Sequence, residues 1–180
     1  IGGPARRLLE VHDSDELVDV LRRGELAHGA LLGGGSNLVV ADAGFDGTVL
    51  QLRSRRVTIE GQRVSADAGL DWDDLVARCV VAGLAGLECL SGIPGHVGAT
   101  PIQNVGAYGQ QVSDCLESVE VVHRGSGERQ DISAADCALG YRDSAFKGPW
   151  RDRYIVTKVR FELSAGPPAA PRYGELSRAL

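Results

Sequence analysis

The sequence predicts an α+β fold. Helical and strand-like patterns interleave along the 180 residues, but they do not follow the strict alternation that builds a parallel βαβ sheet. At least one β-hairpin is indicated, because Val57–Glu60 and Arg63–Ala66 flank a Gly61-Gln62 pair suited to a tight turn. With 43% hydrophobic and 24% charged residues, the chain has the composition of a folded globular protein.

Two helices are predicted. The first is predicted over Asp13–Arg23, with Asp13 as N-cap, Glu16 completing a capping box and Gly24 stopping the helix. The second is predicted after Asp71, where apolar residues recur at helical spacing and form one face. For the tryptophan and the cysteine of this face, core packing is therefore the preferred interpretation. The apolar residues of the second helix are Trp72, Leu75, Val76, Cys79 and Val80.

The remaining elements are strands and one short helix. Tyr154–Leu163 alternates most clearly, so Ile155, Thr157, Val159, Phe161 and Leu163 are predicted to share one face. Ser133 is predicted to cap a short helix that runs through Asp136. The other predicted strands are Gly29–Leu32, Asn37–Val40, Thr48–Leu52 and Ser118–His123.

Several classes of function are disfavoured by composition. The net charge is −5 and the basic residues are scattered, so no nucleic-acid interface is expected. No apolar run approaches the roughly 20 residues that cross a bilayer, and no leader is evident. The four cysteines form no CxxC pair, which predicts reduced thiols and no metal site.

The ends of the sequence indicate a fragment. The chain begins at Ile1, contains no methionine and stops within an amphipathic pattern, Tyr173–Leu180. The proline-rich stretch Gly166–Pro171 predicts a linker into another domain.

A glycine-rich motif follows the first apolar strand. Leu32–Leu38 reads LGGGSNL, and three successive glycines let several amide groups point at one spot, which is typical of an anion-binding nest. Ser36 and Asn37 add side-chain donors. A plain tight turn remains the alternative interpretation.

A second glycine-rich stretch, residues 91–109, carries almost no charge. Its neutral hydrogen-bonding groups, Thr100, Gln103 and Asn104, suit a flat polar heterocycle or a pyrophosphate. His96 could be a ligand or a base, but no carboxylate or second histidine lies nearby in the sequence, so a catalytic role is the weaker interpretation.

A third motif, Tyr141–Lys147, reads YRDSAFK. It is either a charged surface turn or a site in which Arg142 stabilises developing negative charge.

These motifs, in this order and at these distances, resemble the UDP-N-acetylmuramate dehydrogenase family, also called UDP-N-acetylenolpyruvoylglucosamine reductases. The resemblance rests on LGGGSNLVV, on GLECLSGIPGHVGATPIQNVGAYGQQVSD from Gly86 to Asp114, and on YRDSAFK. Ile1–Ala5 resembles the family's N-terminal flavin-domain signature without its leading residues. The similarity runs from Ile1 to about Leu180.

The resemblance implies a two-part FAD-binding unit of the vanillyl-alcohol-oxidase (PCMH) type. We expect two FAD-binding subdomains at residues 1–52 and 53–165, then a linker and the start of a truncated substrate-binding domain at residues 166–180. Noncovalent FAD, NADPH as reductant and a cytoplasmic location are also implied. The expected reaction converts UDP-N-acetylglucosamine enolpyruvate into UDP-N-acetylmuramate for peptidoglycan synthesis.

Site residues follow by motif from the resemblance. Arg142 matches the family's catalytic arginine, and Tyr141 beside it is expected to help hold the substrate. The family's proton-donor serine and late carboxylate have no match here, so we expect this segment alone to be inactive. Gly33, Gly34, Gly35, Ser36 and Asn37 match the pyrophosphate-binding turn, and Gly98, Thr100, Pro101, Asn104 and Gly106 lie in the segment that lines the flavin.

Two alternatives remain open. One is another flavin oxidase or dehydrogenase of the same fold, whose relatives often attach the flavin covalently to histidine or cysteine. The other is a noncatalytic module that binds flavin or nucleotide.

Overall fold

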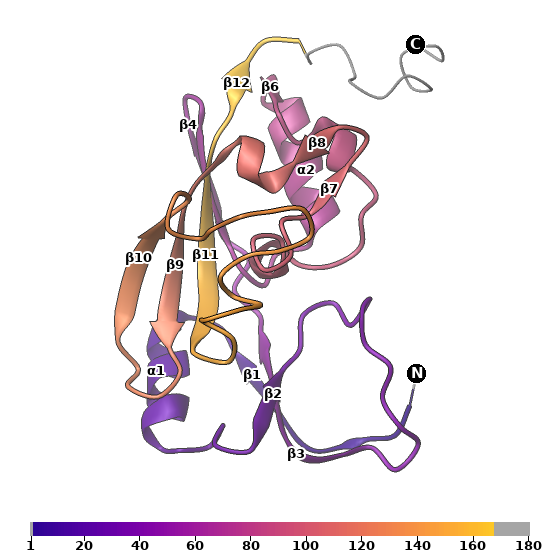
Figure 1. Cartoon of the computed structure of the whole chain (residues 1–180), viewed down its shortest axis with the longest axis vertical. Helices are drawn as coiled ribbons and strands as arrows, with labels where there is room; N and C mark the ends of the chain where they lie inside the picture. Colours follow the sequence, from indigo (N-terminus) through magenta and orange to yellow (C-terminus); the bar gives the residue numbers. More distant parts are fainter. Residues whose placement is uncertain (1, 168–180) are drawn as a thin grey trace.

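The computed structural model describes residues 2–167, arranged around two main β-sheets (Figure 1). The predicted truncated domain, and all but the first two residues of the predicted linker, lie outside the described residues. Three parallel strands form the first sheet in the order β1-β3-β2. Their bounds are β1 Ala5–Val11, β2 Gly29–Leu31 and β3 Phe45–Leu52.

The second sheet has five antiparallel strands in the order β10-β9-β11-β5-β4. Together with the parallel sheet and the helices, it confirms the α+β class. Its strands are β4 Val57–Glu60, β5 Arg63–Asp67, β9 Leu116–His123, β10 Arg129–Ser133 and β11 Tyr154–Glu162. Two small ladders lie outside this sheet. One pairs β6 Leu84–Ala85 with β12 Ser164–Ala165, and the other pairs β7 Gly106–Ala107 with β8 Gln110–Gln111.

Both predicted helices form, as α1 (Ser14–Arg22) and α2 (Trp72–Val81), and α1 begins at the predicted cap. The Asp13 carboxylate accepts from the first-turn amides of α1, and Asp71 does the same for α2. The Glu16 carboxylate accepts from the N–H of His12 at 2.7 Å, one residue before the N-cap that a capping box would use. Three short 3-10 helices also occur: η1 Glu88–Leu90, η2 Val97–Ala99 and η3 Val112–Asp114.

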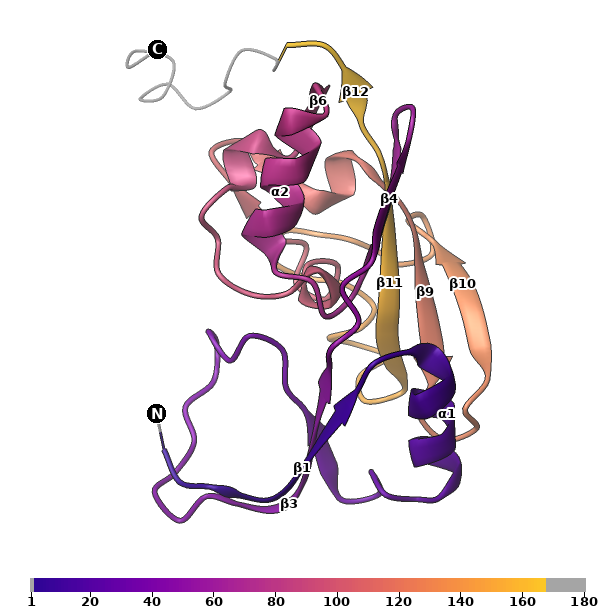
Figure 2. The same ribbon diagram turned by 180° about the vertical axis from the view of Figure 1, so that it is seen from behind.

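Helix α2 and the segment from β6 to η3 cover one face of the five-stranded sheet (Figures 1 and 2). Buried side chains of α2 pack there with those of β5, β9 and β11 in the larger core, where Trp72 and Phe161 are fully buried. Helix α1 packs in a second core, against β1 and β3 and the neighbouring ends of β9 and β11. The two sheets are therefore joined by apolar packing. No helix in residues 2–167 is long and apolar enough to cross a bilayer.

Several local predictions are wrong for identifiable reasons. Residues 37–40 form no strand, because parallel β2 and β3 require a connection that returns to the start of β3, and this segment makes the return. Residues 134–138 form a turn instead of a short helix, and Ala138 has a left-handed φ of 46°. On α2, Val80 was predicted to belong to the apolar face, but it is 51% exposed and does not pack in the core.

The alternation of β11 is interrupted by a β-bulge. The register against β9 shifts between Val156 and Lys158. Ile155 therefore packs in the core around α1, while Val159 and Phe161 pack in the core around α2. The prediction that all alternate residues of this strand share one face is wrong, since one extra residue moves the following side chains to the opposite face.

Candidate functional site

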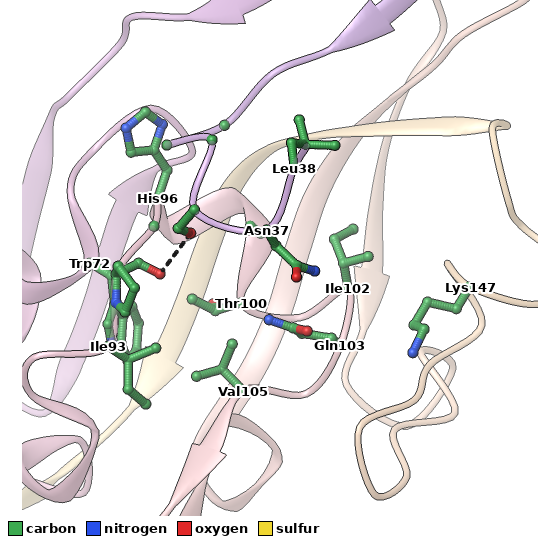
Figure 3. Close-up of a pocket in the computed structure, with 17 residues that line it drawn as sticks. Asn37, Leu38, Trp72, Ile93, His96, Thr100, Ile102, Gln103, Val105 and Lys147 are labelled. Atoms are coloured by element: carbon green, nitrogen blue, oxygen red, sulfur yellow. Dashed lines mark hydrogen bonds between the residues drawn. The ribbon is translucent and has the colours of Figure 1, made fainter. Parts of the chain in front are cut away.

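A glycine-lined cavity of about 320 Å³ lies between the connection that follows β2 and the loop around η2 (Figure 3). The first wall comes from the carboxyl end of a parallel strand, the position where open α/β sheets bind their ligands. The Ser36 hydroxyl donates to the Pro94 carbonyl at 3.4 Å, which links the two walls. The lining residues are Gly33, Gly34, Gly35, Ser36, Asn37, Leu38, Trp72, Ile93, Pro94, Gly95, His96, Ala99, Thr100, Ile102, Gln103, Val105 and Lys147.

The first wall offers free hydrogen-bond donors. Within the described part of the chain, none of the five backbone N–H groups of Gly33–Asn37 donates to a protein acceptor. Gly35 has a φ of 75°, a left-handed conformation that glycine adopts without strain. Successive amides in such a turn can converge on an anion, so this wall can bind phosphate oxygens.

The opposite wall is held in place by the sheet and by α2. The N–H groups of Val97 and Gly98 donate to Leu70 and Ala68 at 2.9 and 3.0 Å. A Cβ atom on Gly98 would lie only 2.5 Å from that of Ala68, so glycine is needed for this close approach. The indole N–H of Trp72 donates to the Leu90 carbonyl at 2.9 Å. The Trp72 side chain therefore packs in the core and also lines the glycine cavity.

A carboxylate on α2 fixes the loop that leads into this wall. Asp73 accepts from the Ser91 hydroxyl and from the N–H of Gly92, both at 2.7 Å. The bond from Gly92 and then the one from Ser91 lower the pKa of Asp73 below its ordinary value. The acid therefore stays ionised and anchors the loop throughout the neutral range.

No carboxylate is among the residues that line the glycine cavity. Burial lowers the pKa of His96, Arg55 and Arg53 lower it further, and Asp71 opposes the shift, so this histidine is neutral at pH 7. Lys147 is then the one charged lining residue in the described structure. Neutral and positive groups suit an anionic ligand, because no charge in the wall repels it.

An apolar cavity of about 170 Å³ adjoins the glycine cavity and shares Gly33, His96, Ala99 and Ile102 with it. Gly98 lines this apolar cavity instead of the glycine cavity. The shared residues form a common wall, so a ligand with a polar end and a flat apolar end could extend from one cavity into the other.

A further cavity of about 460 Å³, the arginine cavity, lies between the β7–β8 ladder and the turn at residues 140–143. The Arg142 guanidinium donates through Nη2 to the Gly106 carbonyl at 2.8 Å, and Tyr141 is 91% exposed. Arg142 is exposed as well, so a ligand in this cavity can reach its guanidinium. The lining residues are Asn104, Gly106, Ala107, Tyr108, Gly109, Gln110, Gln111, Tyr141 and Arg142.

The structure divides the predicted site residues between these cavities. Gly33 to Asn37 and Thr100 line the glycine cavity, whereas Asn104, Gly106, Tyr141 and Arg142 line the arginine cavity. Pro101 is buried and lines none of the three. Asn104 is 3% exposed and its side chain bonds to Gln111, Ser113 and Gly140, so it serves the protein itself.

Several residues that line the glycine cavity were not predicted as site residues, among them Trp72, Ile93, Pro94 and Lys147. Trp72 had the periodicity of a core helix, and Ile93 and Pro94 lay in the glycine-rich stretch without a polar group to mark them. Their apolar character is common in ligand pockets, but it carries no signal in a single sequence.

Comparison with known families settles which family the fold represents. The profile of the family described as "FAD binding domain" matches residues 5–133. The chain belongs to this FAD binding domain family. Its cofactor is accordingly FAD, and the two-sheet architecture is that of an FAD-binding unit.

Named relatives of this FAD-binding chain are all described as UDP-N-acetylenolpyruvoylglucosamine reductase. The relatives from Thermobifida fusca and Streptomyces coelicolor are each 50% identical to it over 100% of the chain, which spans 52% and 48% of their lengths. A crystal structure of the same reductase (MurB) from Thermus caldophilus superposes with a TM-score of 0.77 at 33% identity, covering 93% of this chain and 58% of that one. The chain thus spans about half the length of these relatives.

Proposed function

We propose that this chain is the FAD-binding part of a UDP-N-acetylenolpyruvoylglucosamine reductase, which reduces an enolpyruvyl UDP-sugar with electrons from NADPH. The observation that carries the proposal is that one segment serves two cavities, since Val105 lines the glycine cavity and its neighbours Asn104 and Gly106 line the arginine cavity. One is lined with free backbone amides, and the other contains a guanidinium on a fixed turn. Relatives described as UDP-N-acetylenolpyruvoylglucosamine reductase match the chain over its whole length.

The glycine cavity fits the cofactor that the family implies. The unpartnered amides of Gly33–Asn37 would hold the pyrophosphate, and the Ser36 and Asn37 side chains lie within the same wall. The adjoining apolar cavity, with Gly98 and Ile102 in its wall, would receive flat apolar parts of the cofactor. When bound, FAD would supply hydride transfer to the substrate carbon.

In the arginine cavity, the guanidinium of Arg142 would stabilise charge on the substrate. Hydride addition to an enolpyruvyl group places negative charge on its carboxylate and the neighbouring carbon. A guanidinium can donate two parallel hydrogen bonds to a carboxylate, and so can neutralise that charge in a fixed geometry. The bond from Arg142 to Gly106 orients the side chain before the substrate arrives. Tyr141, exposed on the same turn, is placed to contact the sugar nucleotide.

The remaining parts of the proposal concern attachment, organisation and location. The FAD is held noncovalently in this proposal, as the resemblance implies; none of the four cysteines lines the glycine cavity in residues 2–167, so His96 is the lining residue through which a covalent relative could attach its flavin. The break between the parallel sheet and the antiparallel sheet supports a division near residues 52 and 53. The predicted substrate-binding domain would start after residue 165 and would supply the proton donor. A cytoplasmic location follows from the proposed substrate.

Anaerobic stopped-flow absorbance of the intact gene product tests this function. NADPH should first bleach the flavin, and UDP-N-acetylglucosamine enolpyruvate should then restore its absorbance. Bleached flavin that persists in the presence of this sugar would contradict the proposal. Acid precipitation distinguishes the proposed reductase from an oxidase with covalent flavin. Noncovalent flavin stays in the supernatant, whereas covalent flavin precipitates with the protein.

A further inference from the structure

The turn that carries Arg142 has a strained backbone. Gly140 and Asp143 close it through two backbone hydrogen bonds of 2.9 and 3.3 Å. Within it, Arg142 has a φ of 54°, in the left-handed region that residues with a side chain adopt at a cost. A conformation of this kind persists only where surrounding contacts fix it. The question is therefore which contacts hold this residue.

Three side chains attach the turn and its flanks to the rest of the fold. The Asn104 amide donates to the Gly140 carbonyl at 3.0 Å, and the Ser144 hydroxyl donates to Ile102 at 2.5 Å. The Lys147 ammonium donates to the carbonyl oxygen of Arg142 at 2.7 Å. Of the three, Lys147 alone acts on the Arg142 peptide itself. It is also charged, and charged donors form stronger hydrogen bonds than neutral ones.

Lys147 has no competing ionic partner. No carboxylate in the described structure pairs with it, whereas the other lysine of the sequence, Lys158, pairs with Glu120 on β9. The side chain lies at the edge of the glycine cavity, on a loop separate from Ile102 and Gln103 (Figure 3). Lys147 thus lines one cavity while it bonds to the backbone of the residue that serves the other.

We propose that Lys147 is a positioning residue for Arg142. Its ammonium fixes the Arg142 carbonyl, holds the peptide in the left-handed conformation and so aims the guanidinium into the arginine cavity. This role rests on the proposed function of Arg142. It goes beyond that function because Lys147 itself touches neither the guanidinium nor the arginine cavity.

The kinetic test uses Lys147→Met in the intact gene product, since methionine keeps the length of the side chain and removes the donor. The rate of flavin reoxidation by the enolpyruvyl UDP-sugar should fall roughly 10–100-fold, the scale of a small misplacement of a catalytic group. Because the ammonium is bonded to the Arg142 carbonyl, flavin content and the rate of flavin reduction by NADPH should change much less than the rate of reoxidation. Lys147→Arg should restore much of the lost rate. Lys158→Met, the matched control, should behave as wild type.

A double variant separates positioning from an independent contribution. If Lys147 acts only through Arg142, then Arg142→Ala with Lys147→Met is no slower than Arg142→Ala alone. If the rate reductions of the two single variants multiply in the double variant, the proposal is overturned. A wild-type rate for Lys147→Met would also overturn it. Equal slowing of both half-reactions would overturn it as well, because the lysine would then act on the cofactor cavity instead of on Arg142.

A crystal structure of Lys147→Met tests the positioning without any assay. The Arg142 backbone should leave the left-handed region, or its Nη2 should leave the Gly106 carbonyl; an unchanged turn would overturn the proposal. Failure of the proposed function would look different. The wild-type protein would then not oxidise its flavin with the enolpyruvyl sugar, whatever the turn does in the variant.

Discussion

Gly34 and Gly95, which both line the glycine cavity, approach each other so closely that a Cβ atom on Gly34 would lie 3.1 Å from the Cα atom of Gly95. Backbone meets backbone at this point, so neither wall can move aside as a flexible side chain would. A side chain at residue 34 would therefore push the backbone of Gly95 away and disturb the wall that carries the five free amides.

Gly34→Val should weaken FAD binding. The new side chain would push against Gly95 and would block the approach of a pyrophosphate to the amides. We expect the purified variant to bind FAD at least about tenfold more weakly, measured by flavin absorbance and by titration. Gly148→Val is the matched control, because Gly148 is exposed and a Cβ atom there would meet no atom closer than 4.0 Å. Normal flavin content in Gly34→Val would refute this cofactor site.

Gly98→Ala should reduce stability even in the absence of cofactor. Its Cβ would lie 2.5 Å from that of Ala68, the residue directly after β5, so backbone must shift. Such overpacking costs about 1–3 kcal/mol in the free energy of unfolding, which denaturant titration can measure. Gly148→Ala has no contact under 4.0 Å and should change stability by less than about 0.5 kcal/mol. Equal stabilities of the two variants would contradict the packing described here.

Asp73 should stabilise the fold in a pH-dependent way. Its pKa in the folded protein is lowered, so its contribution is present above the unfolded value of about 3.9 and is lost as the pH falls through the folded value. We expect Asp73→Ala to lower the Tm by roughly 2–4 °C at pH 7, the equivalent of about 1 kcal/mol in a domain of this size. This difference should shrink below about pH 4.

Asp74→Ala is the control for that helix turn. Asp74 makes an exposed pair with Arg78 one turn along α2, and such pairs contribute only about 0.3–0.5 kcal/mol. A larger loss from Asp74→Ala than from Asp73→Ala would indicate that the Ser91–Gly92 loop is not anchored by Asp73.

Local sequence patterns predicted the elements that local interactions determine. The hairpin around Gly61-Gln62 and helix α2 after Asp71 both form where spacing and caps indicated them. The strand predicted at residues 37–40 failed because a strand also needs a neighbour. The central strand β3 already pairs with β1 and β2 on its two edges, and this information is not local.

The candidate site was predictable as a set of residues but not as an arrangement. Residues 98–109 form one motif in the sequence, yet Asn104 has a φ of 43° and changes the direction of the chain within it. Thr100 therefore lines the glycine cavity, while Gly106 lines the arginine cavity. The bond of Lys147 to Arg142 likewise depends on the loop conformation, which no spacing rule gives.

The central claim is that the two cavities divide the reaction, with cofactor binding in the glycine cavity and charge stabilisation by Arg142 beside it. Anaerobic stopped-flow of Arg142→Ala in the intact gene product tests this most directly. Flavin reoxidation by the enolpyruvyl UDP-sugar should slow about 10²–10³-fold, the loss typical of a deleted preorganised donor. Arg142→Lys should retain part of the rate, and flavin reduction by NADPH should be unchanged in both variants. If Arg142→Ala slowed both half-reactions equally, or neither, the claim would be contradicted.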